Sequence, residues 1–477
     1  MSRRPIEALD VSVDLFFLKH IIWKYIFGAA KMACCEGGVR FRLYPKPPYV
    51  HPEWPPEIVC VSEPPGAIGP GPSDDRMHLV RPIGKHFAYG VNPGPLGTPH
   101  LDFPPWKGPV FQPVFPDAEG HFDHLIPGTP EFAEAHVFGT VRFVLDIWER
   151  YFGRRIEWHF AADYRRLEIA ILPGLNNAYA GYGFMEIGAH RFADGSHAPY
   201  ALNFDVIAHE LGHLILYSTV GLPTPATQQG EYFGFQESGA DTTALIAGLH
   251  FASLLEHLLQ ETHGNLYTYN ELDRFAELSP DDQIRLASND VRMSAFAAGW
   301  TEEHALSQPL TGAVFDILVD IFQEMLVDRG LIARDVAEAT RLVRNSPENA
   351  PALQPVFDAA FADRYEDFRA ALVEARDTMG FMLAQTWKQL TADYFTYLDV
   401  AETMIAIEAT TSGGRYRRAM VESFAWREIG QVSAGPRLAP PGPRSHSHSA
   451  RTVAPRIQDQ LPRMSYRERA IMAGIAS

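Results

Sequence analysis

The segment Val206–Ile215 is an apolar run that contains two histidines and a glutamate in the pattern HExxH. Residues four apart lie one turn apart on the same face of an α-helix, so His209 and His213 can present both imidazoles to one ion. Glu210 follows the first histidine directly and can reach a water molecule beside that ion. Two nitrogen ligands, an open coordination position and a carboxylate base are the parts of a zinc hydrolase site. The segment therefore predicts a helix that holds one Zn²⁺.

A second segment with helical periodicity, rich in small side chains, spans residues 235–249. Glu237 and Asp241 are four apart within it and share one face. A carboxylate from this second helix would complete a shell of two histidines and one glutamate, and Asp241 would accept the remaining ring N–H of a ligand histidine. Two alternatives stay open. Glu231, just upstream, is a rival third ligand, and both carboxylates could simply solvate a surface helix.

Together these motifs resemble the thermolysin-like gluzincin metallopeptidases, whose ligand set is HExxH followed by an ExxxD helix. The resemblance covers roughly residues 140–330. It implies a zinc-dependent enzyme that hydrolyses peptide or protein substrates. It also implies that Asn177 and Ala178 lie on an edge strand that pairs with the bound peptide, and that His304 donates a hydrogen bond to the developing oxyanion.

Other residues are candidates for the active site because of their positions in the sequence relative to these motifs. Tyr232 is a candidate second oxyanion donor, and Glu302 would orient His304. Arg292 is the candidate for the arginine that the family carries near the oxyanion, with Arg285 as an alternative. For Tyr232 and Arg292, packing and surface charge are equally consistent roles.

The chain departs from this family in one letter of the motif, because Gly212 stands where close relatives usually carry threonine. The other HExxH families fit less well. Metzincins need a third histidine six residues after the second and a glycine three after it, but Thr219 and Leu216 stand there. Aminopeptidases with a glutamate nineteen residues after the second histidine would need it at Tyr232.

Composition limits the remaining classes. A formal net charge of −17 argues against general binding to nucleic acid or to an anionic membrane. Cys34, Cys35 and Cys60 are too few and too clustered for a disulfide framework, so we expect unpaired thiols. No apolar run has the length of a transmembrane helix, and charges interrupt the apolar N-terminal segment, unlike a signal peptide. We expect a cytoplasmic protein, with secretion by a less obvious signal as the alternative. The oligomeric state is left open.

The expected fold class is α+β: a zincin-like catalytic domain, with a small mixed sheet and metal-binding helices, precedes a mainly α-helical subdomain, and the active-site cleft lies between them. Hydrophobic periodicity predicts a helix from about Pro130 to Tyr151 and strands over 156–160 and 167–172. Ser279–Asp282 and Ser346–Glu348 have the composition of helix starts. Further helices are expected over 314–326, 332–343, 352–379 and 381–407.

Changes in composition divide the chain into five parts. These are an amphipathic segment (1–43), a Pro- and Gly-rich wrap with short strands (44–130), the zincin-like subdomain with HExxH (131–265), the α-helical subdomain (266–433), and a Pro- and Arg-rich tail that we expect to be disordered (434–477).

The sequence thus predicts a zinc metallopeptidase in which His209, His213 and Glu237 hold the ion and Glu210 acts as general base. Two alternatives remain: a zincin-fold hydrolase of a non-peptide amide or ester, and a catalytically restricted zincin-fold binding protein. Calcium is common among the relatives, and Asp205 lies just before the motif, but no complete cluster of oxygen ligands accompanies it.

Overall fold

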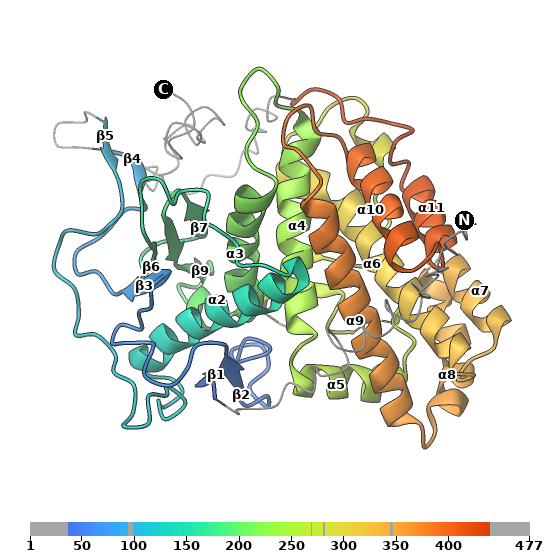
Figure 1. Cartoon of the computed structure of the whole chain (residues 1–477), viewed down its shortest axis with the longest axis horizontal. Coiled ribbons are helices and arrows are strands. Elements are labelled where there is room, and N and C mark those ends of the chain that lie inside the picture. The colour runs from blue at the N-terminus through green and yellow to red at the C-terminus, as the bar shows by residue number, and fades with distance from the viewer. Residues whose placement is uncertain (1–36, 94–98, 269, 280–281, 344–346, 439–477) are drawn as a thin grey trace, which may run out of the picture.

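The computed structural model describes residues 37–93, 99–268, 270–279, 282–343 and 347–438. It is a mixed α/β structure with several small sheets. Strands β1 to β10 gather around helix α2 on one side of the molecule, the later helices form the other side, and α3 and α4 run between the two (Figure 1). Most of the amphipathic segment predicted over 1–43, and most of the tail predicted to be disordered over 434–477, lie outside the described residues, which begin at 37 and end at 438.

The largest described sheet has four strands in the order β3-β6-β8-β7. The strands are β3 (Met77–Val80), β6 (Leu167–Ile171), β8 (Phe184–Ile187) and β7 (Ala178–Gly181). β6 is parallel to both of its neighbours and all five of its residues are buried, as expected for a central parallel strand. β7 pairs antiparallel with β8 and forms the edge. The strand predicted over 167–172 is therefore confirmed.

Helix α2 (Pro130–Phe152) connects β3 to the parallel strand β6, as parallel pairing requires. Thr129 caps its first turn by accepting a hydrogen bond from the Phe132 N–H, and Pro130 occupies the first helical position. Gly153 ends the helix in the left-handed conformation, with φ 66°. The predicted helix is confirmed to within one residue at its C-terminal end.

The strand predicted over residues 156–160 is wrong. These residues form an irregular segment and the start of a turn. The rings of Trp158 and Phe160 stack at 5.5 Å, and the Trp158 indole donates to the Arg76 carbonyl. The apolar alternation that suggested a strand comes instead from aromatic anchors in a loop.

The Pro- and Gly-rich segment forms short antiparallel pairs: β1 (Val39–Leu43) with β2 (Glu57–Val61), and β4 (Gly90–Pro93) with β5 (Pro99–Asp102). Two buried carboxylates of the sheet hold this segment. Glu168 accepts hydrogen bonds from the Tyr89 hydroxyl and the Trp106 N–H, and Glu186 pairs with Lys85 at 2.8 Å. Burying the two carboxylates without these partners would cost free energy of hydration. The contacts therefore fix the Pro- and Gly-rich segment against the sheet.

Cys60 on β2 is disulfide-bonded, which contradicts the prediction of unpaired thiols. Cys34 and Cys35 lie outside the described residues.

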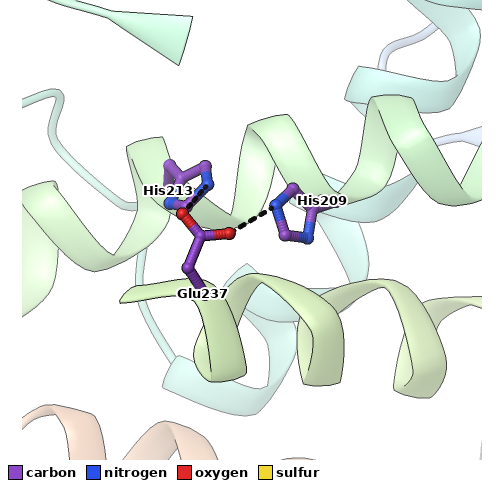
Figure 2. Close-up of side chains that lie close together, drawn as sticks. All are labelled: His209, His213 and Glu237. Atoms are coloured by element: carbon purple, nitrogen blue, oxygen red, sulfur yellow. Dashed lines mark ion pairs between the residues drawn. The ribbon is translucent and has the colours of Figure 1, made fainter. Parts of the chain in front are cut away.

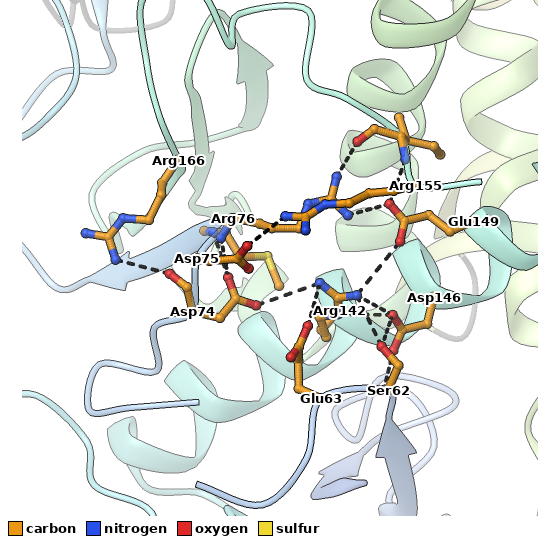
Figure 3. Close-up of polar contacts among 12 residues, drawn as sticks. Ser62, Glu63, Asp74, Asp75, Arg76, Arg142, Asp146, Glu149, Arg155 and Arg166 are labelled. Carbon is orange, nitrogen blue, oxygen red and sulfur yellow. Dashed lines mark hydrogen bonds and ion pairs between the residues drawn. The ribbon is translucent and has the colours of Figure 1, made fainter. Parts of the chain in front are cut away.

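A network of ion pairs joins α2 to the segments before it (Figure 3). The Arg142 side chain is only 4% exposed and contacts the carboxylates of Asp146, Glu63 and Asp74. Arg76 pairs with Glu149 one turn further along α2. Burial of an arginine costs hydration free energy, and here the contacts with carboxylates offset that cost. The network therefore fixes the positions of β1, β2 and β3 against the helix.

Helices α3 (Phe204–Thr219) and α4 (Gly230–Gly248) pack closely. Asn203 caps α3 by accepting a hydrogen bond from the Val206 N–H. A Cβ atom added to Gly212 would lie 2.6 Å from the Ala240 Cα, so any larger side chain would push the two helices apart. This close approach favours glycine at position 212. Helix α5 (Ala252–Thr262) follows.

The C-terminal half is helical but is interrupted where the sequence predicted continuity. Ser279 and Asp282, predicted to belong to a helix start, instead pair with each other at the ends of two antiparallel strands, β11 (Arg274–Ser279) and β12 (Asp282–Leu286). The helix predicted over 352–379 is broken at Asp363, whose φ is 58°. The observed helices are α6 (Glu303–Asp328), α7 (Arg334–Val343), α8 (Gln354–Phe361), α9 (Tyr365–Trp387), α10 (Tyr397–Thr411) and α11 (Arg417–Trp426).

The remaining described elements are short: strands β9 (Ala189–Arg191) and β10 (His197–Pro199), and 3₁₀ turns η2 (Tyr200–Leu202), η3 (Met293–Phe296) and η4 (Pro347–Leu353). Across the core, Trp148 of α2 stacks on Trp387 of α9 at 4.6 Å. Within the described part of the chain, no single helix is long and apolar enough to span a membrane. The bent pair α4 and α5, which meet at 91°, passes the same test of length and composition together.

Replacing Arg142 with alanine should lower the free energy of unfolding by about 3–5 kcal/mol, because the substitution leaves buried carboxylates without their cationic partner. Chemical denaturation followed by circular dichroism measures this loss. Arg155→Ala is the matched control, since Arg155 is 51% exposed and pairs with the equally exposed Asp75; it should cost less than about 1 kcal/mol. Equal losses for the two variants would contradict the structural role of Arg142.

Candidate metal centre

Helix α3 is buried on every side except one. Ala208, Leu211 and Leu214 are fully buried, whereas His209, Glu210 and His213 are half-exposed. The apolar letters around the HExxH pattern thus fix the helix in the core, and the three polar residues line its one open face.

The Glu237 side chain, from α4, lies between the two imidazoles of α3 (Figure 2). The Nε2 atom of His209 is 3.4 Å from Glu237 Oε2, and the Nε2 atom of His213 is 3.8 Å from Glu237 Oε1. Potential donor atoms of all three residues lie within 4.8 Å of one another. Ligands about 2.1 Å from a tetrahedral zinc ion are roughly 3.4 Å apart, so these separations fit the edges of a zinc coordination sphere.

Asp241 fixes the orientation of one histidine. Its Oδ1 atom is 2.9 Å from the Nδ1 atom of His209, and the residue is 2% exposed. Since a carboxylate only accepts, Nδ1 carries the proton and Nε2 keeps a lone pair for a metal. The contact between Asp241 and a ligand histidine expected from the sequence is present.

The charge of Glu237 is held by its neighbours. Burial alone would raise the pKa of this carboxyl, but the imidazole of His213, with those of His209 and His304, outweighs burial and holds the pKa of Glu237 well below its usual range. A carboxylate that is only 8% exposed needs hydrogen-bonding or cationic partners to stay ionised, and a metal ion held between these residues would supply the positive charge. Two neutral imidazoles and one anionic oxygen form a donor set suited to Zn²⁺.

His304 lies in the first turn of α6 and points to the same carboxylate. Its Nε2 atom is 3.1 Å from Glu237 Oε2, and its Nδ1 atom is 2.5 Å from Glu302 Oε1. Glu302 therefore orients this ring in the way the sequence suggested. The structure brings the late histidine to the metal centre although nearly seventy residues separate it from Glu237.

Two further candidates have other partners. The Tyr232 hydroxyl donates to the Gly221 carbonyl at 2.5 Å and accepts from the Gln236 side chain, and the residue is 1% exposed. The Arg292 guanidinium lies 4.5 Å over the ring of Trp426 on α11. These contacts give both residues packing roles, one beside the loop at Gly221 and one against α11.

Glu231, the rival third ligand, accepts hydrogen bonds from the backbone N–H groups of Tyr397 and Ala434. It thereby joins the start of α4 to the C-terminal helices. Glu237 is the carboxylate that meets both histidines.

Asn177 and Ala178 lie at the start of the sheet's edge. Ala178 is the first residue of β7, its N–H is held by the Asn177 side chain, and the Asn177 carbonyl accepts from Gly188. In the described sheet β7 has β8 on one side only, and α3 packs beside it (Figure 1). The open face of the metal helix and the edge strand therefore adjoin.

Other groups of potential metal donors are satisfied by protein partners. Asp205, considered for calcium, pairs with the Lys46 ammonium at 3.2 Å, which fills the place of a cation. The carboxylates of Glu63, Asp74 and Asp75 face arginines (Figure 3). On α5, His257 contacts Glu271 at 2.9 Å, an ordinary hydrogen-bonded ion pair.

One aromatic residue near the centre, Tyr217, is not among the site residues predicted from the sequence. Tyr217 lies one turn beyond His213 on the open face of α3, and their rings stack at 6.2 Å. The signal was available, because the spacing of four that links His209 to His213 continues to position 217.

No family model matches this chain, and no curated protein matches it either. Among solved structures, the precursor of protealysin, a metalloproteinase from Serratia proteamaculans, is similar at 15% sequence identity and a TM-score of 0.30. The match covers 69% of this chain and 83% of that chain. A likeness this distant supports no statement about chemistry, so the case for the site depends on its own geometry.

Asp241→Asn should weaken zinc binding about 10- to 100-fold, because the amide is a poorer acceptor for the Nδ1 proton of His209. Competition with a chromophoric chelator measures the affinity. Asp335→Asn, at an exposed position in the first turn of α7, is the matched control and should bind zinc like the unmodified protein. An unchanged affinity in Asp241→Asn would remove the orienting role of Asp241.

Proposed function

We propose that this chain is a zinc-dependent metallopeptidase of the gluzincin type, in which His209, His213 and Glu237 hold the ion. The main support for the proposal is the position of the Glu237 carboxylate between the imidazoles of His209 and His213. The distances from its oxygens to the two Nε2 atoms suit the ligands of a tetrahedral ion. When bound, zinc supplies Lewis-acid polarisation of the scissile carbonyl and lowers the pKa of a water molecule.

Glu210 is the general base. It follows His209 on the open face of α3 and is half-exposed, so a water molecule beside the metal ligands is within its reach. Its carboxylate accepts a proton as the water oxygen bonds to the carbonyl carbon. The same proton passes to the amide nitrogen, the C–N bond breaks, and the products are a carboxylic acid and an amine, which become a carboxylate and an ammonium group when the second water proton is transferred.

His304 stabilises the charge that develops on the carbonyl oxygen. Glu302 accepts the Nδ1 proton and holds the ring, so the Nε2 edge faces the centre. A protonated Nε2 in this position is a donor whose orientation is fixed before the reaction, and such donors lower the barrier without a cost of reorganisation.

A peptide is favoured over a non-peptide amide or ester because of strand β7. The strand forms the sheet's edge beside α3, where an extended peptide can add by backbone hydrogen bonds. Asn177 and Ala178, at its start, are the proposed positions of first contact. The presence of Glu210 favours an active enzyme over a binding protein that has lost its chemistry.

Glu210→Gln should retain zinc, because the residue is not a ligand, and should abolish cleavage of a diverse peptide pool followed by mass spectrometry. The control is Glu261→Gln on the exposed surface of α5, which should cleave like the unmodified protein. Full hydrolysis by zinc-loaded Glu210→Gln would sink the general-base assignment. If neither the unmodified protein nor the variant cleaves while zinc is bound, peptidase activity itself is refuted.

His304→Ala should lower kcat by roughly 10²- to 10³-fold and change KM little, because the donor acts on charge that appears only in the transition state. Steady-state kinetics on one peptide identified from the pool separate the two constants. His257→Ala, on half-exposed α5 surface, provides the control for the loss of an imidazole. A rise in KM with kcat unchanged would instead assign His304 to substrate binding.

A further inference from the structure

A continuous row of aromatic rings leads away from the metal centre. Tyr217 stacks on the ligand His213 with their ring planes 20° apart. The His159 ring meets Tyr217 at 5.4 Å and Tyr182 at 5.5 Å, both edge to face. Tyr164 continues the row at 5.7 Å from Tyr182. Each step falls within the 4.5–7 Å range of favourable aromatic pairs.

The row follows the edge of the sheet. Tyr182 and Gly183 form the turn that connects β7 to β8, so Tyr182 directly follows the last residue of the edge strand. Tyr217 lies beyond His213 towards the end of α3. Since His159 contacts both tyrosines, the C-terminal parts of α3 and β7 come together at this point.

The rings are held in place from behind. Gly183 has φ 88°, and a Cβ atom there would lie 2.6 Å from the Tyr164 ring, so only glycine lets that ring support the turn. The Tyr182 hydroxyl donates to Asp163 at 2.5 Å. Fixed rings of this kind bind a partner at a low cost in conformational entropy.

The rings of the row are uncharged and partly exposed. Tyr164, Tyr182, Tyr217 and His159 are all half-exposed. Burial lowers the pKa of His159 to about 4, so this imidazole is neutral near pH 7. Tyrosine rings of this exposure, beside an open strand edge and next to a metal ligand, offer surface to an apolar group that lies along β7.

We propose that Tyr217, His159 and Tyr182 form a subsite that receives an aromatic side chain of the peptide, on the side of the metal centre towards the β7–β8 turn. The inference depends on the proposed peptidase function and adds its substrate preference. An extended peptide advances about 3.3 Å per residue, and the Tyr217 ring lies 6.2 Å from that of His213, so the aromatic side chain would lie about two residues from the scissile bond. Edge-to-face contact with fixed rings favours an aromatic side chain over an aliphatic one of similar size.

The test is a pair of peptides that differ only in a phenylalanine or an alanine at successive positions around one cleaved bond. The zinc-loaded full chain should favour phenylalanine at one position on one side of that bond. Tyr182→Leu should raise KM for this peptide roughly threefold to tenfold, with kcat and the kinetics of the alanine peptide unchanged. Tyr182 is chosen because two rings separate it from His213.

Two variants control the experiment. Tyr182→Phe keeps the ring and loses only the hydrogen bond to Asp163, so it should retain the preference. Tyr394→Leu makes the same exchange at a 65% exposed site outside the row and should also retain it. Zinc content measured on every variant separates an effect on the subsite from an effect on the metal.

Each outcome decides the question. Loss of the phenylalanine preference in Tyr182→Leu alone supports the subsite. Cleavage without any aromatic preference, or a preference that survives in Tyr182→Leu, overturns the inference and leaves the peptidase proposal standing. Absence of cleavage by the zinc-loaded unmodified chain overturns both. A loss of preference in Tyr182→Phe as well would assign the effect to the hydroxyl and its contact with Asp163, and would overturn recognition by the ring.

Discussion

The contact between α3 and α4 is the constraint on which the candidate centre depends. Gly212 lies against the Ala240 backbone so closely that any side chain there would separate the helices. Ordinary van der Waals contact needs 3.4–4 Å, so relieving the 2.6 Å approach would shift the two helices by about 1 Å and disturb the 3.4 Å spacing between His209 and Glu237. A single glycine in the motif therefore links helix packing to the chemistry of the site.

The buried Glu237 carboxylate is tolerated at the centre because polar neighbours compensate for its lost hydration. Glu237 meets His209 and His213 from α3 and His304 from α6, and Asp241 anchors His209 from behind. Three helices thus meet at one carboxylate. The rest of the fold determines where those helices lie, with α2 and its arginine network supporting the sheet whose edge adjoins α3.

Local patterns predicted local structure well and long-range pairing poorly. The periodicity over 130–151 and the buried run at 167–171 became α2 and β6, because helix and strand periods are properties of neighbouring residues. The alternation at 156–160 failed because rings that anchor a loop imitate a strand. The composition of residues 279–282 suits a helix start and a hairpin equally, and only the pairing of β11 with β12, in which Ser279 is opposite Asp282, distinguishes the two.

The sequence by itself determined the two histidines, the glutamate beside them and the carboxylate pair on the next helix, because a spacing of four residues on an α-helix fixes a shared face. Tertiary structure decided the contacts between residues that are far apart in the sequence, which residue spacing within one helix does not predict. It brought Glu237 rather than Glu231 to the histidines, turned His304 towards them, gave Tyr232 and Arg292 other partners, and joined β3 to β6 across almost ninety residues. Those outcomes depend on which distant surfaces pack together, and packing depends on the shape of the whole core.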